Sequence, residues 1–287
     1  MTKPLVAYAG EPGAFAEDAV LRWFADPDPQ PVPSFRAVFE AVRDGAALAG
    51  VVPVESSLVG TIRENLDLLL EFELTIVGEV SVPVRLALLA LPGERLDTIT
   101  SVHSIAAALG QADEFLRAGT WTVHTTYNTA GAARQVAERR EPGAAAVASA
   151  RAASLHGLEV IADGIQTGDD NRTRFAVVAS PGAAAAVRAA AAEAALGGGA
   201  RTTLVFGVRN VPGSLHRSLG AFASRGINLS RLESRPWRRR GARWEYLFLA
   251  DLDTAATDPA CAAALIDLGQ DAEMIRILGT YPAAVED

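Results

Sequence analysis

The chain opens with LVAYAGEPGAF (residues 5–15), which is an apolar run, a glycine-rich turn and the start of an amphipathic segment. The run predicts a buried strand, and apolar residues at helical spacing over 15–23 predict a helix after the turn. A second helix is expected over 35–44 with Ser34 as its N-cap, followed by an apolar strand at 49–54. This order indicates an α/β fold with mostly parallel sheets, in which ligands bind at the carboxyl ends of strands.

The strand and helix pattern continues to about residue 180, where the composition changes. Residues 181–200 are alanine-rich and end in three consecutive glycines, which predicts a linker. Residues 201–287 then show the order strand, helix, strand, strand, helix, strand, which is the ferredoxin-like order. We therefore expect domains at 1–180 and 201–287, joined by the linker at 181–200.

Composition excludes several classes of function. The chain has 287 residues and a formal net charge of -8, so nucleic acid is not an expected partner. Its basic run, Arg235 to Arg243, is interpreted as a solvated loop tip. Cys261 is the single cysteine, which leaves no intrachain disulfide and favours a reducing compartment. With no signal peptide and no apolar stretch long enough to cross a membrane, we expect a cytoplasmic protein.

Metal and cofactor signals are also missing from the sequence. None of the four histidines belongs to a pair with ligand spacing, and there is no phosphate-binding loop or nucleophile elbow. We therefore predict no metal and no cofactor. What remains is a small-molecule site made of hydroxyls, amides and a few charges.

Two polar clusters at strand and helix ends are candidates for that site. The first follows an apolar strand and consists of Glu55, Ser56 and Ser57. It can bind a ligand or cap the next helix, and spacing alone does not separate these readings. The second opens a helix and consists of Asn128, Thr129 and Ala130. Its backbone N–H groups can bind an anion, although capping accounts for the same residues.

A third polar cluster, residues 169–175, enters an apolar strand. Taken alone, such a run is typical of a solvated loop. If the strand already begins there, alternation puts Thr173 and Phe175 on one face of the sheet and Arg172 and Arg174 on the other.

In order along the chain, these clusters resemble the motifs of the prephenate dehydratase family. NRTRF (171–175) is similar to the family's Asn-x-Thr-Arg-Phe signature, and GVVPVESS (50–57) is similar to its Gly-Val-Val-Pro-Ile-Glu-Asn-Ser segment. Its opening glycine-rich turn, its Ser-His-x-x-Ala-Leu-x-Gln-Cys segment and its Ser/Asp-Thr-Ala motif are also matched in order. The resemblance runs from Leu5 to Pro282. Ser56 replaces the family's asparagine, and Ile105 and Ala112 replace its histidine and cysteine.

The resemblance implies a two-lobed, periplasmic-binding-protein-like (type II) catalytic region, with the chain crossing between lobes near 79–83 and near 165. It implies conversion of prephenate to phenylpyruvate with loss of carbon dioxide and water, a reaction in which positioning and a proton donor suffice. We expect Thr173 to hydrogen-bond the leaving hydroxyl and Glu55 to act as the acid behind it. Arg174 or the helix start near Thr129 is the candidate for the pyruvyl carboxylate. The remaining expected substrate-binding residues are Phe175, Ser56, Ser57, Ser104, Gln111, Asn128, Ala130 and Asn171.

The last domain resembles an ACT regulatory domain. NVPGSL (210–215) is similar to the Pro-Gly-Ala-Leu effector loop, and INLSRLESRP (227–236) is similar to Ile-Asn-Leu-Thr-Lys-Ile-Glu-Ser-Arg-Pro. Without the family, Pro212 and Gly213 indicate only a tight turn. The resemblance implies inhibition by L-phenylalanine bound at a subunit interface, and hence a homodimer or homotetramer. The expected effector-binding residues are Pro212, Gly213, Ser214, Leu215, Glu233, Ser234, Arg235 and Pro236.

Two alternatives stay open at this point. An arogenate dehydratase has the same motifs and differs in its substrate, which carries an amino group in place of the keto group. A non-catalytic amino-acid sensor, by contrast, needs no proton donor. The dense polar lining expected from Thr173, Ser104, Gln111 and Glu55 favours the enzyme.

Overall fold

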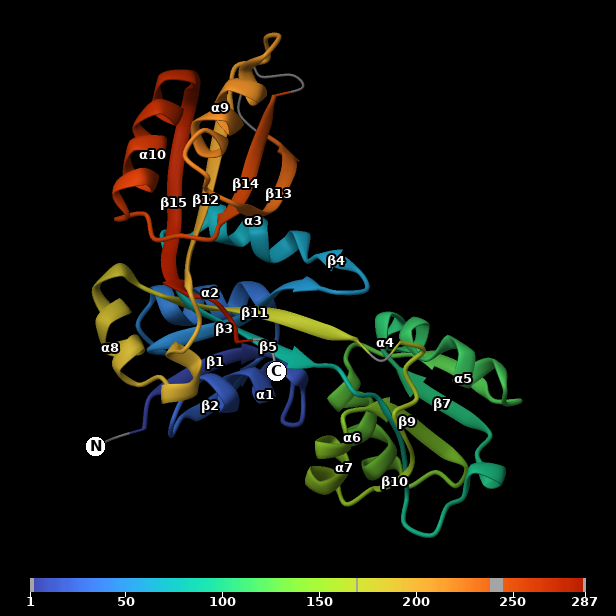
Figure 1. Ribbon diagram of the computed structural model, residues 1–287. Coiled ribbons are helices and arrows are strands. Elements are labelled where there is room, and N and C mark those ends of the chain that lie inside the picture. The colour runs from blue at the N-terminus through green and yellow to red at the C-terminus, as the bar shows by residue number, and fades with distance from the viewer. Residues whose placement is uncertain (1–2, 169, 238–244, 286–287) are drawn as a thin grey trace.

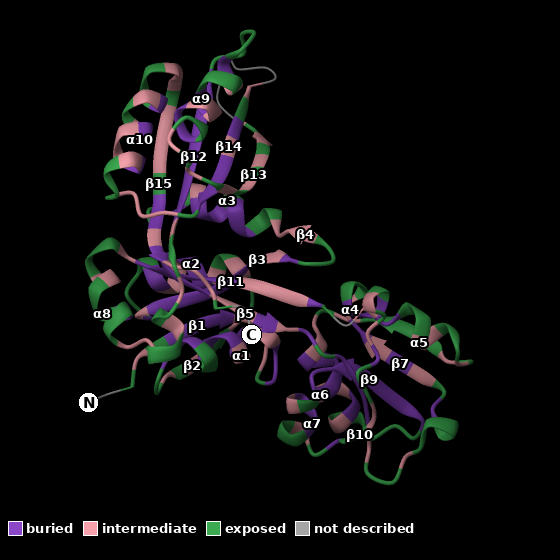
Figure 2. Cartoon of the chain, viewed as in Figure 1, coloured by how far each residue is buried: buried purple, intermediate pink, exposed green. Residues whose placement is uncertain are grey.

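A computed structural model describes residues 3–168, 170–237 and 245–285 of the chain. The described residues form three β-sheets (Figure 1). The first two sheets, with their helices, make two lobes joined by long strands, and the third sheet belongs to a domain that sits on the first lobe. The central strands of the sheets are largely buried, whereas edge strands such as β8 and β2 and the outer faces of the helices are more exposed (Figure 2). No helix in the described ranges is long and apolar enough to cross a membrane.

The first lobe is built on the N-terminal sheet. Its strands are, in spatial order, β2 (Asp28–Val32), β1 (Leu5–Ala9), β3 (Ala49–Ser56), β11 (Arg172–Ala179) and β5 (Thr75–Pro83), with β4 (Gly60–Thr61) paired to β3. Its helices are α1 (Phe15–Trp23), α2 (Phe35–Arg43) and α3 (Arg63–Glu71). The predicted N-cap is confirmed, because the Ser34 hydroxyl accepts a hydrogen bond from the Ala37 amide.

The second lobe holds the middle of the chain. Its strands are, in spatial order, β10 (Glu159–Asp163), β6 (Ala87–Ala90), β9 (Ala144–Ala148), β7 (Ser101–Ser104) and β8 (Thr122–Thr125). Its helices are η1 (Leu96–Thr98), α4 (Ala106–Gln111), α5 (Asp113–Arg117), α6 (Thr129–Arg139) and α7 (Ala150–His156). The two-lobed α/β arrangement expected from the sequence is therefore present.

Both sheets are mixed, so the expectation of mostly parallel sheets was wrong. β1 is parallel to β2 and β3, but β11 is antiparallel to both β3 and β5. In the second lobe, β6 is antiparallel to β9 and β10. The reason is the crossing of the chain: it leaves the first lobe along β5 and returns along β11, so the returning strand must run the opposite way.

The alanine-rich stretch expected as a linker is folded against the first lobe. It forms η2 (Pro181–Ala183), α8 (Ala184–Ala189) and η3 (Glu193–Leu196). Val187 is fully buried, and the Ala192 amide donates to the Trp23 carbonyl. Alanine has the highest helix propensity, so this composition favours short helices once one face finds a surface to cover.

The third domain has the predicted ferredoxin-like order. Its elements are β12 (Ala200–Val208), α9 (Ser214–Ala223), β13 (Leu229–Pro236), β14 (Tyr246–Leu252), α10 (Pro259–Asp271) and β15 (Ala272–Pro282). The strands lie in the order β13-β14-β12-β15. Of the basic run, Arg238, Arg239, Arg240 and Arg243 lie outside the described residues.

One face of the third sheet is covered by its own helices and the other packs on the first lobe. Phe206 belongs to the core under α9 and α10, whereas its neighbour Val205 belongs to a core shared with Leu66 of α3. The contact is close: a Cβ built on Gly279 of β15 would lie 2.1 Å from the carbonyl oxygen of Ile76 in β5. The third domain therefore lies directly against the sheet that carries β11.

Candidate active site at the junction of the lobes

The parallel strands of the two lobes end where the lobes meet. The loop after β1 touches the loop after β9, because the Ser149 hydroxyl donates to the Gly13 carbonyl over 2.8 Å. Arg151 of α7 adds an ion pair to Glu17 of α1, with a separation of 2.7 Å. Because α/β proteins bind ligands at the carboxyl ends of their strands, this junction is the candidate position of the active site.

Thr173 lies near the start of the returning strand β11, where that strand enters the first lobe. It is in register with Ser56 of β3 and Val82 of β5. Thr173 and Phe175 project from the same face of the sheet. Phe175 is 3% exposed and belongs to the first lobe's core, so it packs instead of lining an open site. Across the described chain, the Thr173 hydroxyl has no side-chain hydrogen bond, which leaves it available to a ligand.

Asn171 and Gln111 join the two lobes beside Thr173. The Asn171 amide donates to Gln111 Oε1 over 2.9 Å, and the Asn171 carbonyl accepts from the Val84 amide over 2.7 Å. Gln111 also accepts, through its carbonyl, from the amide of Thr167. These bonds fix the returning segment against α4, and they bring together two residues that the sequence predicted separately.

The two serines after Glu55 shape the turn that follows β3. Ser57 Oγ donates to the Asp170 carbonyl over 2.9 Å and accepts from the Arg172 amide over 3.0 Å. Ser56 Oγ accepts weak hydrogen bonds of 3.4 Å from the backbone amides of Leu58 and Val59. Both hydroxyls therefore stabilise the backbone of the turn and of the returning segment, and neither caps α3, whose N-cap is Ile62 with no side-chain cap hydrogen bond.

The second lobe places its predicted residues at the same junction. Ser104 is fully buried and donates to the Val147 carbonyl over 2.6 Å, so its hydroxyl holds β7 to β9. Asn128 caps α6 by accepting from the Gly131 amide, and Thr129 begins the helix. Ala130 is fully buried in a core cluster of the first lobe, so the start of α6 lies against that lobe.

A cluster that the sequence did not predict bridges the lobes next to α6. Arg134 donates to both carboxylate oxygens of Glu11, at 2.7 and 3.1 Å, and to the Tyr127 hydroxyl at 2.8 Å. Tyr127 in turn donates to Glu11. The hydrogen bond from Arg134 lowers the pKa of Glu11 below its ordinary value. Glu11 lies in the opening glycine-rich turn, whose sequence predicts only a backbone conformation, and no local pattern links it to Arg134.

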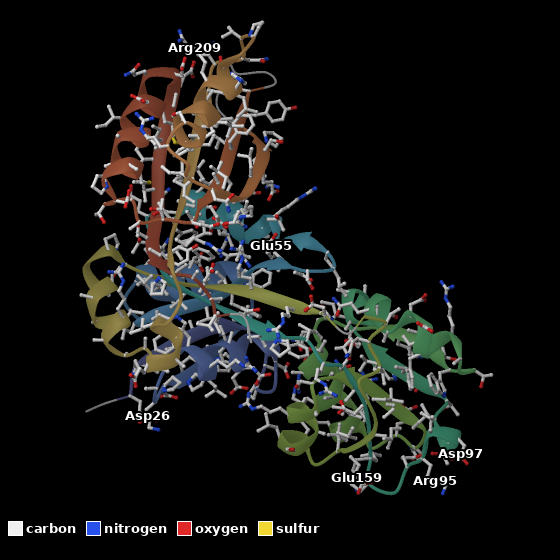
Figure 3. All side chains as sticks on the ribbon, viewed as in Figure 1. Asp26, Glu55, Arg95, Asp97, Glu159 and Arg209 are labelled. Carbon is white, nitrogen blue, oxygen red and sulfur yellow. The ribbon has the colours of Figure 1, made fainter. Side chains whose placement is uncertain are left out.

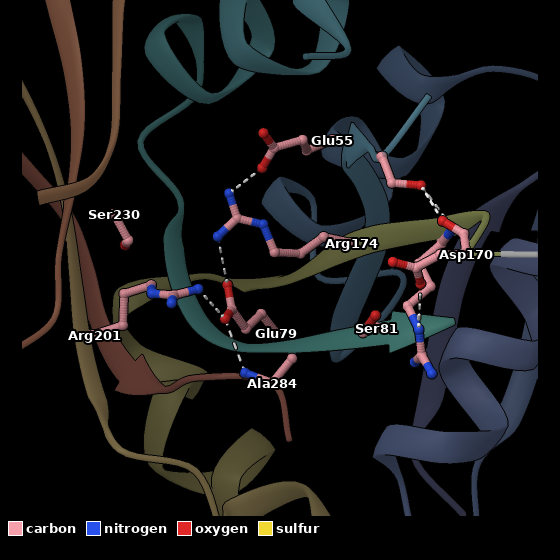
Figure 4. Close-up of a pocket in the computed structure, with 10 residues that line it drawn as sticks. Glu55, Glu79, Ser81, Asp170, Arg174, Arg201, Ser230 and Ala284 are labelled. Atoms are coloured by element: carbon pink, nitrogen blue, oxygen red, sulfur yellow. Dashed lines mark hydrogen bonds and ion pairs between the residues drawn. The ribbon is translucent and has the colours of Figure 1, made fainter. Parts of the chain in front are cut away.

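Arg174 and Glu55 lie on the other face of the sheet from Thr173. Arg174 Nη2 pairs with Glu55 Oε2 at 2.5 Å, in a cavity of about 540 Å³ between the first lobe and the third domain (Figure 4). Figure 3 labels Glu55 where the third domain meets the first lobe. The structure therefore does not bring Arg174 or Glu55 together with Thr173, and the sequence did not identify what covers this face.

The effector segments expected in the third domain lie at one end of its sheet. β12 and β13 are both antiparallel to β14, so the loop after β12 and the end of β13 share that end. It is the end away from the lobes, where Figure 3 labels Arg209. Arg235 is an exception to the expected site, because its side chain pairs with Asp67 of α3 at 2.5 Å.

In the described ranges, no group of three or more His, Cys, Asp or Glu side chains is placed to hold a metal ion. The ring pair His103 and His124 is stacked with centroids 4.8 Å apart. Burial, and secondly the neighbouring His124, lowers the pKa of His103. This pair sits on β7 and β8 in the second lobe.

A sequence model of the prephenate dehydratase family matches residues 6–183. The chain belongs to this family. It is 38% identical over 291 residues to arogenate dehydratase 1 of Petunia hybrida, covering 96% of this chain and 66% of that protein. It is 37% identical to arogenate dehydratase/prephenate dehydratase 2 of Arabidopsis thaliana, covering 96% of this chain and 72% of that one. The chain thus spans about two thirds of the length of these curated relatives of the prephenate dehydratase family.

Solved structures of similar chains agree with the fold along its whole length. Prephenate dehydratase from Arthrobacter aurescens, solved in complex with L-Phe, has a TM-score of 0.84 and 32% identity, covering 97% of this chain and 90% of that chain. A structure described as GqqA, a novel type of quorum quenching acylase, has a TM-score of 0.83 and 34% identity, covering 97% and 98%.

Proposed function

We propose that this member of the prephenate dehydratase family converts prephenate to phenylpyruvate, carbon dioxide and water. The observation that carries the proposal is the Thr173 hydroxyl, which stands at the junction of the lobes without a side-chain partner in the described chain. In the reaction, the bond from the ring to its carboxylate breaks and its electron pair makes the ring aromatic. The bond from the ring to its hydroxyl breaks at the opposite carbon, and a proton converts the departing hydroxide to water.

Positioning accounts for most of what such a site must do. Thr173 would hydrogen-bond the leaving hydroxyl, and the start of α6 at Thr129 would receive the pyruvyl carboxylate through its backbone amides. The ring carboxylate should meet no cation, because an ion pair there would stabilise the substrate more than the transition state. Arg174 satisfies this requirement, since it lies on the other face of the sheet.

The proton donor predicted from the sequence fits this geometry less well. Glu55 would have to exchange its ion pair with Arg174 for a contact on the opposite face of the sheet. The proposal therefore gives Glu55 no contact with the substrate. Its effect on the reaction would run through Arg174.

The test is turnover of prephenate, followed by phenylpyruvate formation, in Thr173→Val. This change removes the hydroxyl and keeps the branched shape, and we expect kcat to fall on the order of a hundredfold or more. Thr122→Val, at an exposed position of β8, is the matched control and should match the wild type. Full turnover in Thr173→Val would remove Thr173 from the mechanism. Arogenate is assayed in parallel, and a preference for it would change the substrate while keeping the site.

We further propose that the third domain is an ACT domain that binds L-phenylalanine and inhibits the enzyme. Support comes from the ferredoxin-like strand order, and from the position of the Pro212–Leu215 loop and the Glu233–Pro236 segment at the same end of the sheet. The similar Arthrobacter aurescens structure was solved with L-Phe. Calorimetric titration with L-phenylalanine tests this, and absence of binding to a folded protein would refute it. A homodimer or homotetramer and a cytoplasmic location remain predictions.

A further inference from the structure

Arg174 is the centre of an ionic cluster that joins three strands. Its guanidinium pairs with Glu55 of β3 at 2.5 Å, with Glu79 of β5 at 3.3 Å and with Asp251 of β14 at 3.0 Å. Two of these strands flank β11 in the first lobe, and the third belongs to the third domain. The Arg174 side chain is 16% exposed, so the cluster is largely removed from water.

The carboxylates around Arg174 are themselves held by the third domain. Asp251 is fully buried, pairs with Arg231 at 2.9 Å and accepts from the Thr203 hydroxyl at 2.7 Å. Burial raises the pKa of Asp251, but the guanidinium groups of Arg231 and Arg174 outweigh it, so the carboxyl titrates below its ordinary value.

Glu79 is tied to the same domain. It is 2% exposed, pairs with Arg201 at 2.6 Å and accepts from the Ala284 amide at 2.8 Å (Figure 4). Both partners follow the alanine-rich stretch in sequence. Buried ion pairs stabilise only when their geometry is good, so this cluster defines one placement of the third domain against β11.

One peptide unit connects the Arg174 cluster to the candidate site. Arg174 directly follows Thr173, and the two side chains leave opposite faces of β11. Thr173 is in register with Ser56 and Val82, and Arg174 with Glu55 and Ser81. Loss of the bond between Arg174 and Asp251 therefore releases a tether on the residue next to the one that carries the Thr173 hydroxyl.

We propose that Arg174 is a positioning residue: through its ion pair with Asp251, the third domain fixes β11 and sets the position of the Thr173 hydroxyl. This rests on the proposed function of Thr173. Arg174 touches no substrate. For it to bind a carboxylate beside Thr173, it would have to leave three carboxylates and cross the sheet.

The experiment compares kcat and KM for prephenate in Arg174→Lys, Asp251→Asn and the double variant. Lysine keeps the charge but not the fork that reaches several carboxylates. Both single variants should lower kcat on the order of tenfold to a hundredfold, since displaced catalytic groups act in this range, with KM within about twofold. The double variant should be no slower than the slower single variant, because both changes break one link.

The matched control is Asp267→Asn, which breaks an ion pair of 2.6 Å with Arg225, both partners lying within the third domain. It should leave both constants at their wild-type values. A large rise in KM for Arg174→Lys, with an unaffected Asp251→Asn, would show that Arg174 binds substrate and would overturn the proposal. Should Asp251→Asn not fold, Asp251→Glu keeps the charge, displaces the carboxylate by one methylene and takes its place.

A second measurement separates failure of this inference from failure of the proposed function. Backbone amide hydrogen exchange over residues 172–175 is followed well below the unfolding temperature. In Asp251→Asn this exchange should be faster by about tenfold or more, and in Asp267→Asn unchanged. If the wild type turns over neither prephenate nor arogenate, the proposed function fails while exchange still decides whether Asp251 holds β11. Equal exchange in wild type and Asp251→Asn would refute the link itself.

Discussion

Gly213 gives the sharpest test of the proposed effector loop. It precedes α9 with φ +82°, a left-handed conformation that glycine adopts without strain. A Cβ at this position would also lie 3.0 Å from Nη1 of Arg217, the end of a flexible side chain that can move aside. The substitution Gly213→Ala therefore acts mainly on the backbone of the loop.

The expected magnitude follows from that backbone conformation. A non-glycine residue in the left-handed region costs about 1–2 kcal/mol, so the free loop of Gly213→Ala relaxes to another conformation. Binding of L-phenylalanine must then restore the native one. Because RT is about 0.59 kcal/mol, this cost lowers the affinity for L-phenylalanine roughly 5- to 30-fold. Turnover in the absence of phenylalanine should not change.

Gly226 supplies the matched control for this experiment. Its φ is +68°, and a Cβ there would meet no atom within 4 Å, so Gly226→Ala has the same backbone cost. It follows α9 and precedes β13, at the end of the sheet opposite the effector loop. Calorimetric titration with L-phenylalanine should show weaker binding only in Gly213→Ala, although both variants lose stability. Equal affinity in Gly213→Ala and wild type, or equal losses in both variants, would refute the reasoning.

Three further predictions concern the stability of the fold. In Gly279→Ala, the new Cβ would lie 2.1 Å from the Ile76 carbonyl oxygen, so the free energy of unfolding in urea titrations should fall by about 1–3 kcal/mol. Gly220→Ala lies inside α9 with no atom within 4 Å of the new Cβ, and it should raise the same free energy by about 0.5–1 kcal/mol. Because Arg134 lowers the pKa of Glu11, their ion pair stabilises the protein above the ordinary glutamate value of about 4.3 and is lost as the pH falls below it. Wild type should therefore lose more stability than Glu11→Gln between about pH 6 and pH 3, by up to about 1 kcal/mol for a partly exposed pair. Parallel stability curves would contradict this.

Features set by local sequence could be predicted. The apolar run of β1, the Ser34 cap of α2 and the ferredoxin-like order of the third domain all follow from periodicity, capping and turn residues. Strand alternation also predicted that Thr173 and Arg174 leave β11 on opposite faces. Motif order added the prephenate dehydratase family, which the family comparison confirmed.

Partners that are distant in sequence could not be predicted. Arg174 and Asp251 are 77 residues apart, and Glu11 and Arg134 are 123 apart, so no periodicity connects them. The sequence said which face of β11 Arg174 occupies but not that the third domain covers that face. That missing fact led to the expectation of Arg174 and Glu55 beside the substrate.

The composition of the contact between domains explains why an ionic cluster lies behind Thr173. Elsewhere the contact combines an apolar core, in which Val205 and Leu278 of the third sheet pack with Leu66 of α3, with bonds from Arg276 to the carbonyls of Leu70 and Phe72. Burial of apolar surface is non-directional, so it holds the domain on the lobe but tolerates small shifts along the sheet. The bonds of Arg174 to its carboxylates lose their strength when donors and acceptors move apart by fractions of an ångström. The apolar surface thus favours contact in any nearby alignment, while directional bonds fix one of them, and among these bonds the ones of Arg174 act on β11 itself, next to Thr173.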